Sequence, residues 1–181
     1  GYEDVAYDLL LQETYPSWLY PVKMGATTIW ERWDGQKTDS TFQDAGMNSF
    51  NHYAYGAIGD WMYKSSAGIN YSSPGYRAIT IYPHITKKLN FSSASFESPY
   101  GIISSGWERK EGKIIITVKI PVNTTARIFL PTNDMSRMKY TGPAAVPKAA
   151  KAKDPFTVVL NNKEKRLEVS AGSGDYVFEL T

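Results

Sequence analysis

The stretch GIISSGWERKEGKIIITVKI, residues 101–120, determines the fold class of the second half of this chain. Within residues 113–120 every even position carries an aliphatic side chain, whereas the odd positions include threonine and lysine. Such alternation is typical of a strand with one face on a hydrophobic core. The tripeptide Lys-Glu-Gly at 110–112 separates this strand from residues 101–109 and is a hairpin signal. The stretch therefore predicts two antiparallel strands joined by a tight turn.

Short segments of the same kind continue on both sides of this hairpin. The expected strands are Ala78–Tyr82, Leu89–Glu97, Gly101–Arg109, Lys113–Ile120, Thr125–Leu130, Thr157–Leu160, Leu167–Val169 and Tyr176–Leu180. Many short strands joined by turns predict an antiparallel β-sandwich. Between them, the segment Thr141–Asp154 is poor in bulky apolar residues and rich in Ala, Pro and Lys. We expect an exposed, mobile loop there.

The pattern in the first part of the chain is helical. Apolar residues recur at helical spacing over residues 5–10, and a broad apolar stripe runs along Asn48–Tyr63. Two shorter elements are also expected. One begins at Trp18 and is stopped by Pro21, and Thr28–Trp33 is read as the start of a helix.

The two halves together predict an α+β chain that changes character near residue 74. We expect a short helical part over residues 1–74 and an antiparallel β-sandwich over residues 75–181. The helices are few and their apolar stripes are wide. Helices of this kind usually belong to a larger helical body, so we expect a piece of a multidomain protein.

Composition narrows the class of function. The chain of 181 residues carries 20 basic and 18 acidic side chains, a net charge of +2, and no basic run that would indicate a nucleic-acid surface. It has no cysteine, which excludes disulfides and thiolate nucleophiles. Residues 1–12 lack the features of a signal peptide, and no segment is apolar over the length of a membrane span. We therefore expect neither nucleic acid nor membrane as a partner.

The segment GATTIWERWDG, residues 25–35, carries one acid, Glu31, between Trp30 and Trp33. Aromatic rings beside a carboxylate are typical of a sugar site, because the rings pack on the sugar face and the carboxylate moves protons. The plainer interpretation is a carboxylate at a helix start, paired with Arg32 or a lysine.

A second dense segment, MNSFNHYAYGAIGDWMY at residues 47–63, places His52 among aromatic residues. A histidine in such a position is as often part of the core as part of a binding site. Metal binding has little support, because the two histidines lie 32 positions apart and no cysteine accompanies them. We expect no metal site and no cofactor.

Three long segments are spread over residues 20–131, most of the length of the chain. They are YPVKMGATTIWERWDG (residues 20–35), MNSFNHYAYGAIGDWMY (47–63) and YGIISSGWERKEGKIIITVKIPVNTTARIFLP (100–131). In this order they resemble three parts of the bacterial α-L-rhamnosidases, glycoside hydrolase family 78. These parts are the segment bearing the general base, the barrel helix that follows it, and the core of the C-terminal β-sandwich.

The resemblance implies an inverting glycoside hydrolase that cleaves terminal α-L-rhamnosides, so that a rhamnose-containing glycan or glycoside is the expected partner. Residues 1–74 would be the last helices of an (α/α)6 barrel. Glu31 matches the family's general base and His52 a histidine at the sugar, while Trp30 and Trp33 are candidates for the pocket wall. The family's general acid lies far upstream of this segment. We therefore expect these residues alone to be inactive.

Two alternatives stay open. The chain is a carbohydrate-binding or structural β-sandwich that does not catalyse, with Trp107 or Tyr100 as the aromatic contact, or it is an interaction domain. For the last, we expect self-association through the exposed helical face, since large apolar patches tend to find partners.

Overall fold

The computed structural model describes residues 2–142 and 156–181. The chain divides into two compact units, the first ending at Trp61 and the second beginning at Met62. The domain boundary expected between residues 74 and 75 stays a prediction. Within the described residues, the stretch just before it already belongs to the second unit.

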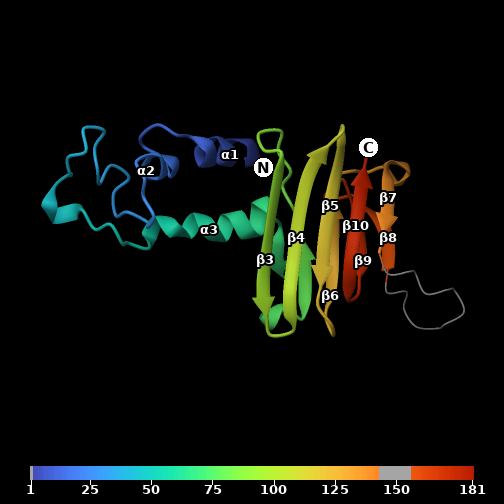
Figure 1. The fold of residues 1–181 in the computed structure, drawn as a ribbon. Helices are drawn as coiled ribbons and strands as arrows, with labels where there is room; N and C mark the ends of the chain where they lie inside the picture. The colour runs from blue at the N-terminus through green and yellow to red at the C-terminus, as the bar shows by residue number, and fades with distance from the viewer. Residues whose placement is uncertain (1, 143–155) are drawn as a thin grey trace, which may run out of the picture. The chain divides into compact units, whose positions relative to one another are not determined.

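The described residues of the second unit form two five-stranded sheets, with strand orders β1-β2-β6-β9-β8 and β3-β4-β5-β10-β7 (Figure 1). The strands are β1 Ile69–Tyr71, β2 Ala78–Ile81, β3 Phe91–Ser98, β4 Gly101–Lys110, β5 Lys113–Ile120, β6 Thr125–Leu130, β7 Met138–Thr141, β8 Phe156–Asn161, β9 Arg166–Ala171 and β10 Gly174–Leu180. Every pair is antiparallel except β2 with β6, which is parallel. The predicted sandwich is confirmed, with this one parallel pair as an addition.

The hairpin of β4 and β5 forms as expected. Lys110 lies opposite Lys113, and the two residues between them turn the chain. Glu111 has a φ of 51° and Gly112 a φ of 76°, so both central residues have the positive φ that a two-residue hairpin turn requires. Along β5 the alternation also holds, because Ile116, Val118 and Ile120 are at most 3% exposed.

Buried residues from both sheets form one core in the second unit. Its members are Ile69, Ile79, Ile81, Ile103, Trp107, Ile116, Val118, Ile120, Ala126, Ile128, Leu130, Leu167, Val169, Ala171, Tyr176, Phe178 and Leu180. The aliphatic and aromatic side chains of the two sheets therefore bury each other, which supplies the main favourable free energy of folding.

Side chains of β4 form hydrogen bonds with the segment that precedes β1. The indole Nε1–H of Trp107 donates to the carbonyl oxygen of Ser66 at 2.9 Å, and the hydroxyl of Ser105 donates to that of Ala67 at 2.6 Å. Ser66 is the last residue of a helical run and Ala67 follows it, at the end where the last carbonyls have no partner within the helix. Two buried side chains of the sheet therefore supply the donors that the helix end lacks.

Two strands, β1 and β7, were not expected from the sequence. Both are short, with three and four residues, and a pattern over so few residues does not predict a strand. The mobile loop expected over Thr141–Asp154 lies almost entirely outside the described residues; Thr141 itself ends β7.

The helical segments of the chain are shorter than expected. They are α1 Glu3–Leu11, α2 Leu19–Lys23, η1 Ala45–Met47, η2 Ala54–Ala57, α3 Ile58–Trp61 and η3 Met62–Ser66, with two further turns, η4 Pro74–Tyr76 and η5 Met135–Arg137, in the second unit. The element expected to stop at Pro21 continues to Lys23. Pro21 lies in its first turn, where a missing backbone N–H costs little.

One helix prediction is wrong and a second has the wrong bounds. Thr28–Trp33 is not helical, whereas the helix expected over Asn48–Tyr63 is present but begins at Ala54 and continues to Ser66. The cause is that residues 28–31 and 49–52 use their backbone groups to bond to each other. An apolar spacing that fits a helix does not reveal such pairing between distant segments.

Candidate active site

Residues 28–31 and residues 49–52 lie side by side in opposite directions. The backbone N–H of Glu31 donates to the carbonyl oxygen of Ser49, and that of His52 donates to the carbonyl oxygen of Ile29, both at 2.8 Å. The hydroxyl of Thr28 donates to the carbonyl oxygen of Phe50. This pairing places Glu31 and His52, the two main candidates from the sequence, on neighbouring segments.

The carboxylate of Glu31 is oriented by a backbone group. Its Oε2 accepts a hydrogen bond from the N–H of Ser49 at 3.1 Å, and the side chain is half-buried. Arg32 does not pair with it, because the guanidinium Nε of Arg32 lies 3.4 Å from Oδ1 of Asp34. Asp34 also accepts a hydrogen bond from the amide of Gln43 at 2.6 Å. The plainer interpretation of the motif was a carboxylate paired with Arg32 or a lysine, and no such ion pair of Glu31 occurs among the described residues.

The ring of His52 makes a hydrogen bond through one nitrogen and a stacking contact on one face. Nδ1 accepts a hydrogen bond from the backbone N–H of Ala54 at 3.2 Å, and the ring stacks on Tyr53 with centroids 5.5 Å apart and an interplanar angle of 6°. The residue is half-buried, whereas Tyr53 is 89% exposed. His52 is thus at the surface of the first unit and not part of a closed core.

The two tryptophans of the motif have different surroundings. Trp30 is 6% exposed and meets Phe50 edge-on, with ring centroids 5.1 Å apart. Trp33 is half-buried and stacks on Tyr55 at 4.6 Å. Among the described residues the buried Nε1–H of Trp33 has no acceptor. Such a donor costs about 1–3 kcal/mol when it stays unpaired.

A small apolar cavity of about 40 Å³ lies in this aromatic cluster. It is lined by Trp18, Pro21, Val22, Ala26, Thr28, Ile29, Trp30, Trp33 and Tyr55. The volume is close to the roughly 30 Å³ that one water occupies in the liquid, so a sugar ring does not fit. Glu31 and His52 do not line it. The described residues therefore place the acid and the histidine on paired segments but do not enclose a sugar site.

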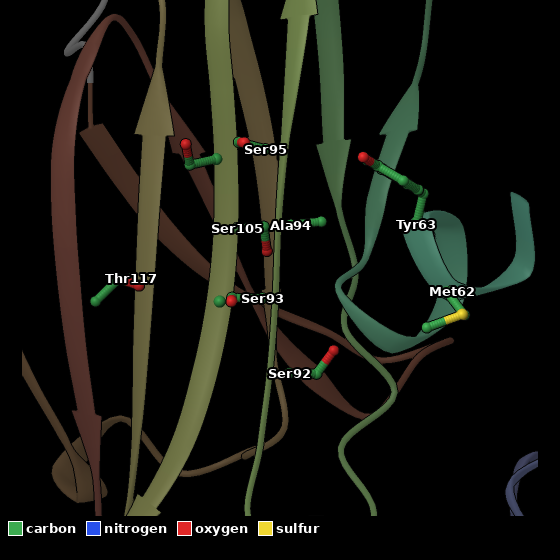
Figure 2. Close-up of a pocket in the computed structure, with 10 residues that line it drawn as sticks. Met62, Tyr63, Ser92, Ser93, Ala94, Ser95, Ser105 and Thr117 are labelled. Carbon is green, nitrogen blue, oxygen red and sulfur yellow. The ribbon is translucent and has the colours of Figure 1, made fainter. Parts of the chain in front are cut away.

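A larger hollow of about 540 Å³ lies on the sandwich and is open to solvent (Figure 2). Hydroxyl side chains from β3, β4 and β5 line it beside Met62 and Tyr63, and no carboxylate or histidine is among them. It has no pair of groups for acid–base catalysis. Trp107, proposed as a glycan platform, is 2% exposed and cannot stack on a sugar, whereas Tyr100 is 36% exposed.

Two absences hold for residues 2–142 and 156–181. No group of three or more His, Cys, Asp and Glu is placed to hold a metal ion. None of the helices has the length and apolar character needed to span a membrane.

Sequence reasoning missed the residues that hold the candidates in place. Ser49 and Ala54 act through their backbone N–H groups, which any residue except proline possesses, so no sequence signal marks them. Thr28 acts through its hydroxyl, and its position just before the acid is the single hint that the sequence offers.

Comparison with known proteins gives the same family for both units. Residues 1–65 match the model of the bacterial α-L-rhamnosidase six-hairpin glycosidase domain, and residues 68–144 match that of the bacterial α-L-rhamnosidase C-terminal domain. An α-L-rhamnosidase of Streptomyces avermitilis is 45% identical over 141 aligned residues. The aligned residues are 78% of this chain and 14% of that protein. One from Formosa agariphila is 39% identical over 99% of this chain and 19% of its own length.

Solved structures agree with the sequence matches. The Streptomyces avermitilis α-L-rhamnosidase complexed with L-rhamnose superimposes with a TM-score of 0.81 at 39% identity, over all of this chain and 16% of that one. The native enzyme from Aspergillus terreus gives a TM-score of 0.77 at 30% identity, over 98% of this chain and 17% of its own. The chain thus spans less than a fifth of these relatives, and it belongs to the bacterial α-L-rhamnosidase family, with parts of the six-hairpin glycosidase domain and of the C-terminal domain.

Proposed function

We propose that Glu31 is the general base of an inverting α-L-rhamnosidase whose general acid lies outside these 181 residues. The observation that carries the proposal is the state of its carboxylate. One oxygen is fixed by the N–H of Ser49 at 3.1 Å, and no cation among the described residues pairs with the carboxylate. An oriented, unneutralised carboxylate is suited to accept a proton from water.

The reaction needs two carboxyl groups on opposite sides of the sugar. In inverting enzymes these groups stand roughly 6.5–9.5 Å apart, which leaves room for a water between the base and the sugar. Glu31 takes a proton from this water while the water oxygen bonds to the anomeric carbon. The bond from that carbon to the leaving oxygen breaks, and the acid protonates that oxygen. The products are rhamnose of inverted configuration and a free alcohol.

Asp34, the other acid of the motif, is a weaker candidate for the base. Its two carboxylate oxygens are engaged by Arg32 at 3.4 Å and by Gln43 at 2.6 Å. Both contacts would have to break before a water could approach the carboxylate. Asp34 instead keeps the loop after Glu31 in shape.

His52 and the tryptophans complete the part of the site that this chain supplies. His52 lies on the segment paired with that of Glu31 and donates a hydrogen bond to the bound sugar. Trp33 forms part of the pocket wall. Trp30, which is 6% exposed, packs behind that wall and does not line the pocket itself. A rhamnose-containing glycoside as substrate is supported by the family and by the Streptomyces avermitilis relative complexed with L-rhamnose.

The test uses a composite enzyme, in which this chain replaces the corresponding segment of the Streptomyces avermitilis α-L-rhamnosidase. The change Glu31→Gln should lower kcat on an aryl α-L-rhamnoside by about 10²–10⁴-fold, the usual contribution of a general base. Asp34→Asn is the matched control and should stay within about tenfold of the parent, because it removes no proton-transfer step. Circular dichroism verifies that each variant is folded.

Two results would contradict this assignment. One is an E31Q enzyme that keeps more than a tenth of the activity while D34N loses more. The other is a product of retained anomeric configuration, seen by proton NMR early in the reaction. The 181-residue chain by itself should release no product from the same glycoside, since it has no general acid in the proposed site.

The chain in isolation also self-associates through apolar residues of its first helix. Val5 and Leu9 of α1 are 54% and 52% exposed, and Tyr2 before them is 84% exposed. In a six-hairpin domain such a face packs on neighbouring helices. Light scattering of the chain should show mass rising with concentration, and the double change Val5→Ser with Leu9→Ser should reduce it. A monomer at every concentration would count against this surface.

A further inference from the structure

We propose that the edge strand β3 pairs with β3 of a second copy of the 181-residue chain, antiparallel and centred on Ala94. The inference concerns the sandwich alone, so it stands or falls independently of the proposed function. It follows from the length of this edge, from its unused backbone groups and from the small side chains beside it.

Strand β3 is the longest edge strand among the described residues. Its sheet has the order β3-β4-β5-β10-β7, so β3 has β4 on one side and no described strand on the other. It contains eight residues, whereas the other edge strands β1, β7 and β8 contain three, four and six. All eight residues pair with β4 in one continuous register. A long, regular edge of this kind is a template for a further strand.

The backbone groups of alternate β3 residues are available for such a strand. Just before β3, the N–H of Arg109 donates to the carbonyl oxygen of Asn90 at 2.7 Å. Hydrogen-bonded pairs of an antiparallel ladder recur at every second residue, so the even-numbered residues of β3 bond to β4. The odd-numbered residues point their N–H and C=O groups away from β4, and no hydrogen bond between described residues engages these groups. They belong to Phe91, Ser93, Ser95 and Glu97.

The side chains of β3 do not keep a second strand away. Edge strands are commonly protected by lysine, by proline or by a bulge, and Phe91–Ser98 has none of these. Its one charged residue is Glu97. Residues 92–95, three serines and an alanine, line the hollow of about 540 Å³, and Figure 2 shows how short these side chains are. The space beside this edge is therefore open to a neighbouring strand.

The sequence of β3 is complementary to itself in one register. Both copies offer their odd-numbered residues, so the hydrogen-bonded pairs must join odd residues to odd residues. With Ala94 at the centre, Phe91 pairs with Glu97 and Ser93 with Ser95, and every residue of the row has a partner. A centre at Ser93 or Ser95 leaves one end of the row unpaired. The two Glu97 carboxylates then lie at opposite ends, roughly 20 Å apart, which avoids like charges directly opposite each other. This symmetry favours a second copy as the partner.

A cysteine at the centre of the register tests the pairing. The chain has no cysteine of its own, so each variant carries a single thiol. In this register the two copies of residue 94 form a non-hydrogen-bonded pair with Cα atoms about 4.5 Å apart, which a disulfide can span. Oxidation of Ala94→Cys with diamide should convert most of the chain into a covalent dimer on a non-reducing gel.

Glu97→Cys is the matched control for this cross-link. Residue 97 is exposed and residue 94 is half-buried, so random collisions would cross-link position 97 at least as well. In the proposed register the two copies of residue 97 are roughly 20 Å apart, and this variant should stay mostly monomeric. Equal or greater cross-linking of Glu97→Cys overturns the register.

A second test measures affinity in the Val5→Ser, Leu9→Ser background, which removes the surface on α1. Light scattering should show a mass that rises towards twice that of one chain. Ser95→Pro removes one N–H per copy from the pairing and none from β4, so it should raise Kd at least about fivefold. Ser95→Thr keeps this N–H and should change Kd by no more than about twofold. Ser93→Lys with Ser95→Lys leaves the backbone intact and should also weaken the dimer, because lysines then face each other.

Three results would overturn the proposal. One is a mass of a single chain at every concentration in the Val5→Ser, Leu9→Ser background. Another is a Ser95→Pro dimer as tight as that of Ser95→Thr. The third is slow amide exchange of Ser93 in a monomer, which would mean that another part of the same chain covers the edge. The proposal expects exchange at Ser93 to slow only as the concentration rises.

Discussion

The change Trp107→Phe tests whether the sandwich depends on the bond between β4 and the end of the preceding helical run. Trp107 is 2% exposed, and its Nε1–H is 2.9 Å from the carbonyl oxygen of Ser66. Phenylalanine buries about 40 Å² less apolar surface, which costs about 1 kcal/mol at 25 cal/mol per Å². The carbonyl of Ser66 loses its donor in a buried place, which costs about 1–3 kcal/mol more. The sum is about 2–4 kcal/mol.

Urea unfolding of the 181-residue chain, followed by circular dichroism in the β-sheet region, measures this loss. With a slope near 2 kcal/mol per M, the midpoint of the sandwich transition should fall by about 1–2 M. Tyr100→Phe is the matched control, since Tyr100 is 36% exposed and its hydroxyl makes no bond with a described residue. A Trp107→Phe midpoint within about 0.2 M of the parent would refute the reasoning, because neither the buried area nor the carbonyl would then matter.

Three further outcomes follow from single contacts. Gly68→Ala should destabilise the sandwich by about 2–5 kcal/mol in the same urea assay, because Gly68 has a φ of 84° and an added Cβ would lie 2.3 Å from the nitrogen of Pro83. The hydrogen bond from Arg127 lowers the pKa of Glu168 in the folded protein below 4.5, the pKa of that carboxyl in the unfolded chain. The ion pair therefore stabilises the fold above pH 4.5, and this stabilisation is lost as the pH falls through the folded-state pKa of Glu168. Arg127→Met should therefore reduce the loss of unfolding free energy that occurs below about pH 4.5. The reduction should be at most about 1 kcal/mol, since the arginine is half exposed. Thr28→Val should speed amide exchange at His52 several-fold, seen by NMR, because one of the bonds that hold the paired segments is lost.

The sandwich was largely predictable because its signals are local. The alternation along residues 113–120 and the turn at 110–112 depend on neighbours in sequence, and both are confirmed. Strand β7 and the parallel pairing of β2 with β6 were not predictable, since they depend on partners far along the chain. Strand β1 pairs with the next strand, β2, but its three residues are too few to show a pattern. The same limit explains the wrong helix at Thr28–Trp33, whose backbone bonds to a distant segment.

The candidate site divides in the same way. The motif around Glu31 and the histidine at position 52 could be read from the sequence and from the resemblance to a known family. The sequence does not reveal the hydrogen bonds that orient these two side chains. They come from the backbone N–H of Ser49 to Glu31 and from that of Ala54 to His52. The roles of these side chains therefore stay proposals, while the family of the chain is established.

The position of β10 has a consequence for how the chain is made in the cell. Gly174–Leu180 pairs with β5 on one side and with β7 on the other, and Tyr176, Phe178 and Leu180 bury their side chains. During synthesis β3, β4 and β5 leave the ribosome before β10, so their sheet lacks its inner strand until residues 174–180 have emerged. A premature stop codon before residue 174 would remove that strand. Strands β5 and β7 would then both lack their shared partner in the sheet. The sandwich therefore completes its folding only after translation has passed β10.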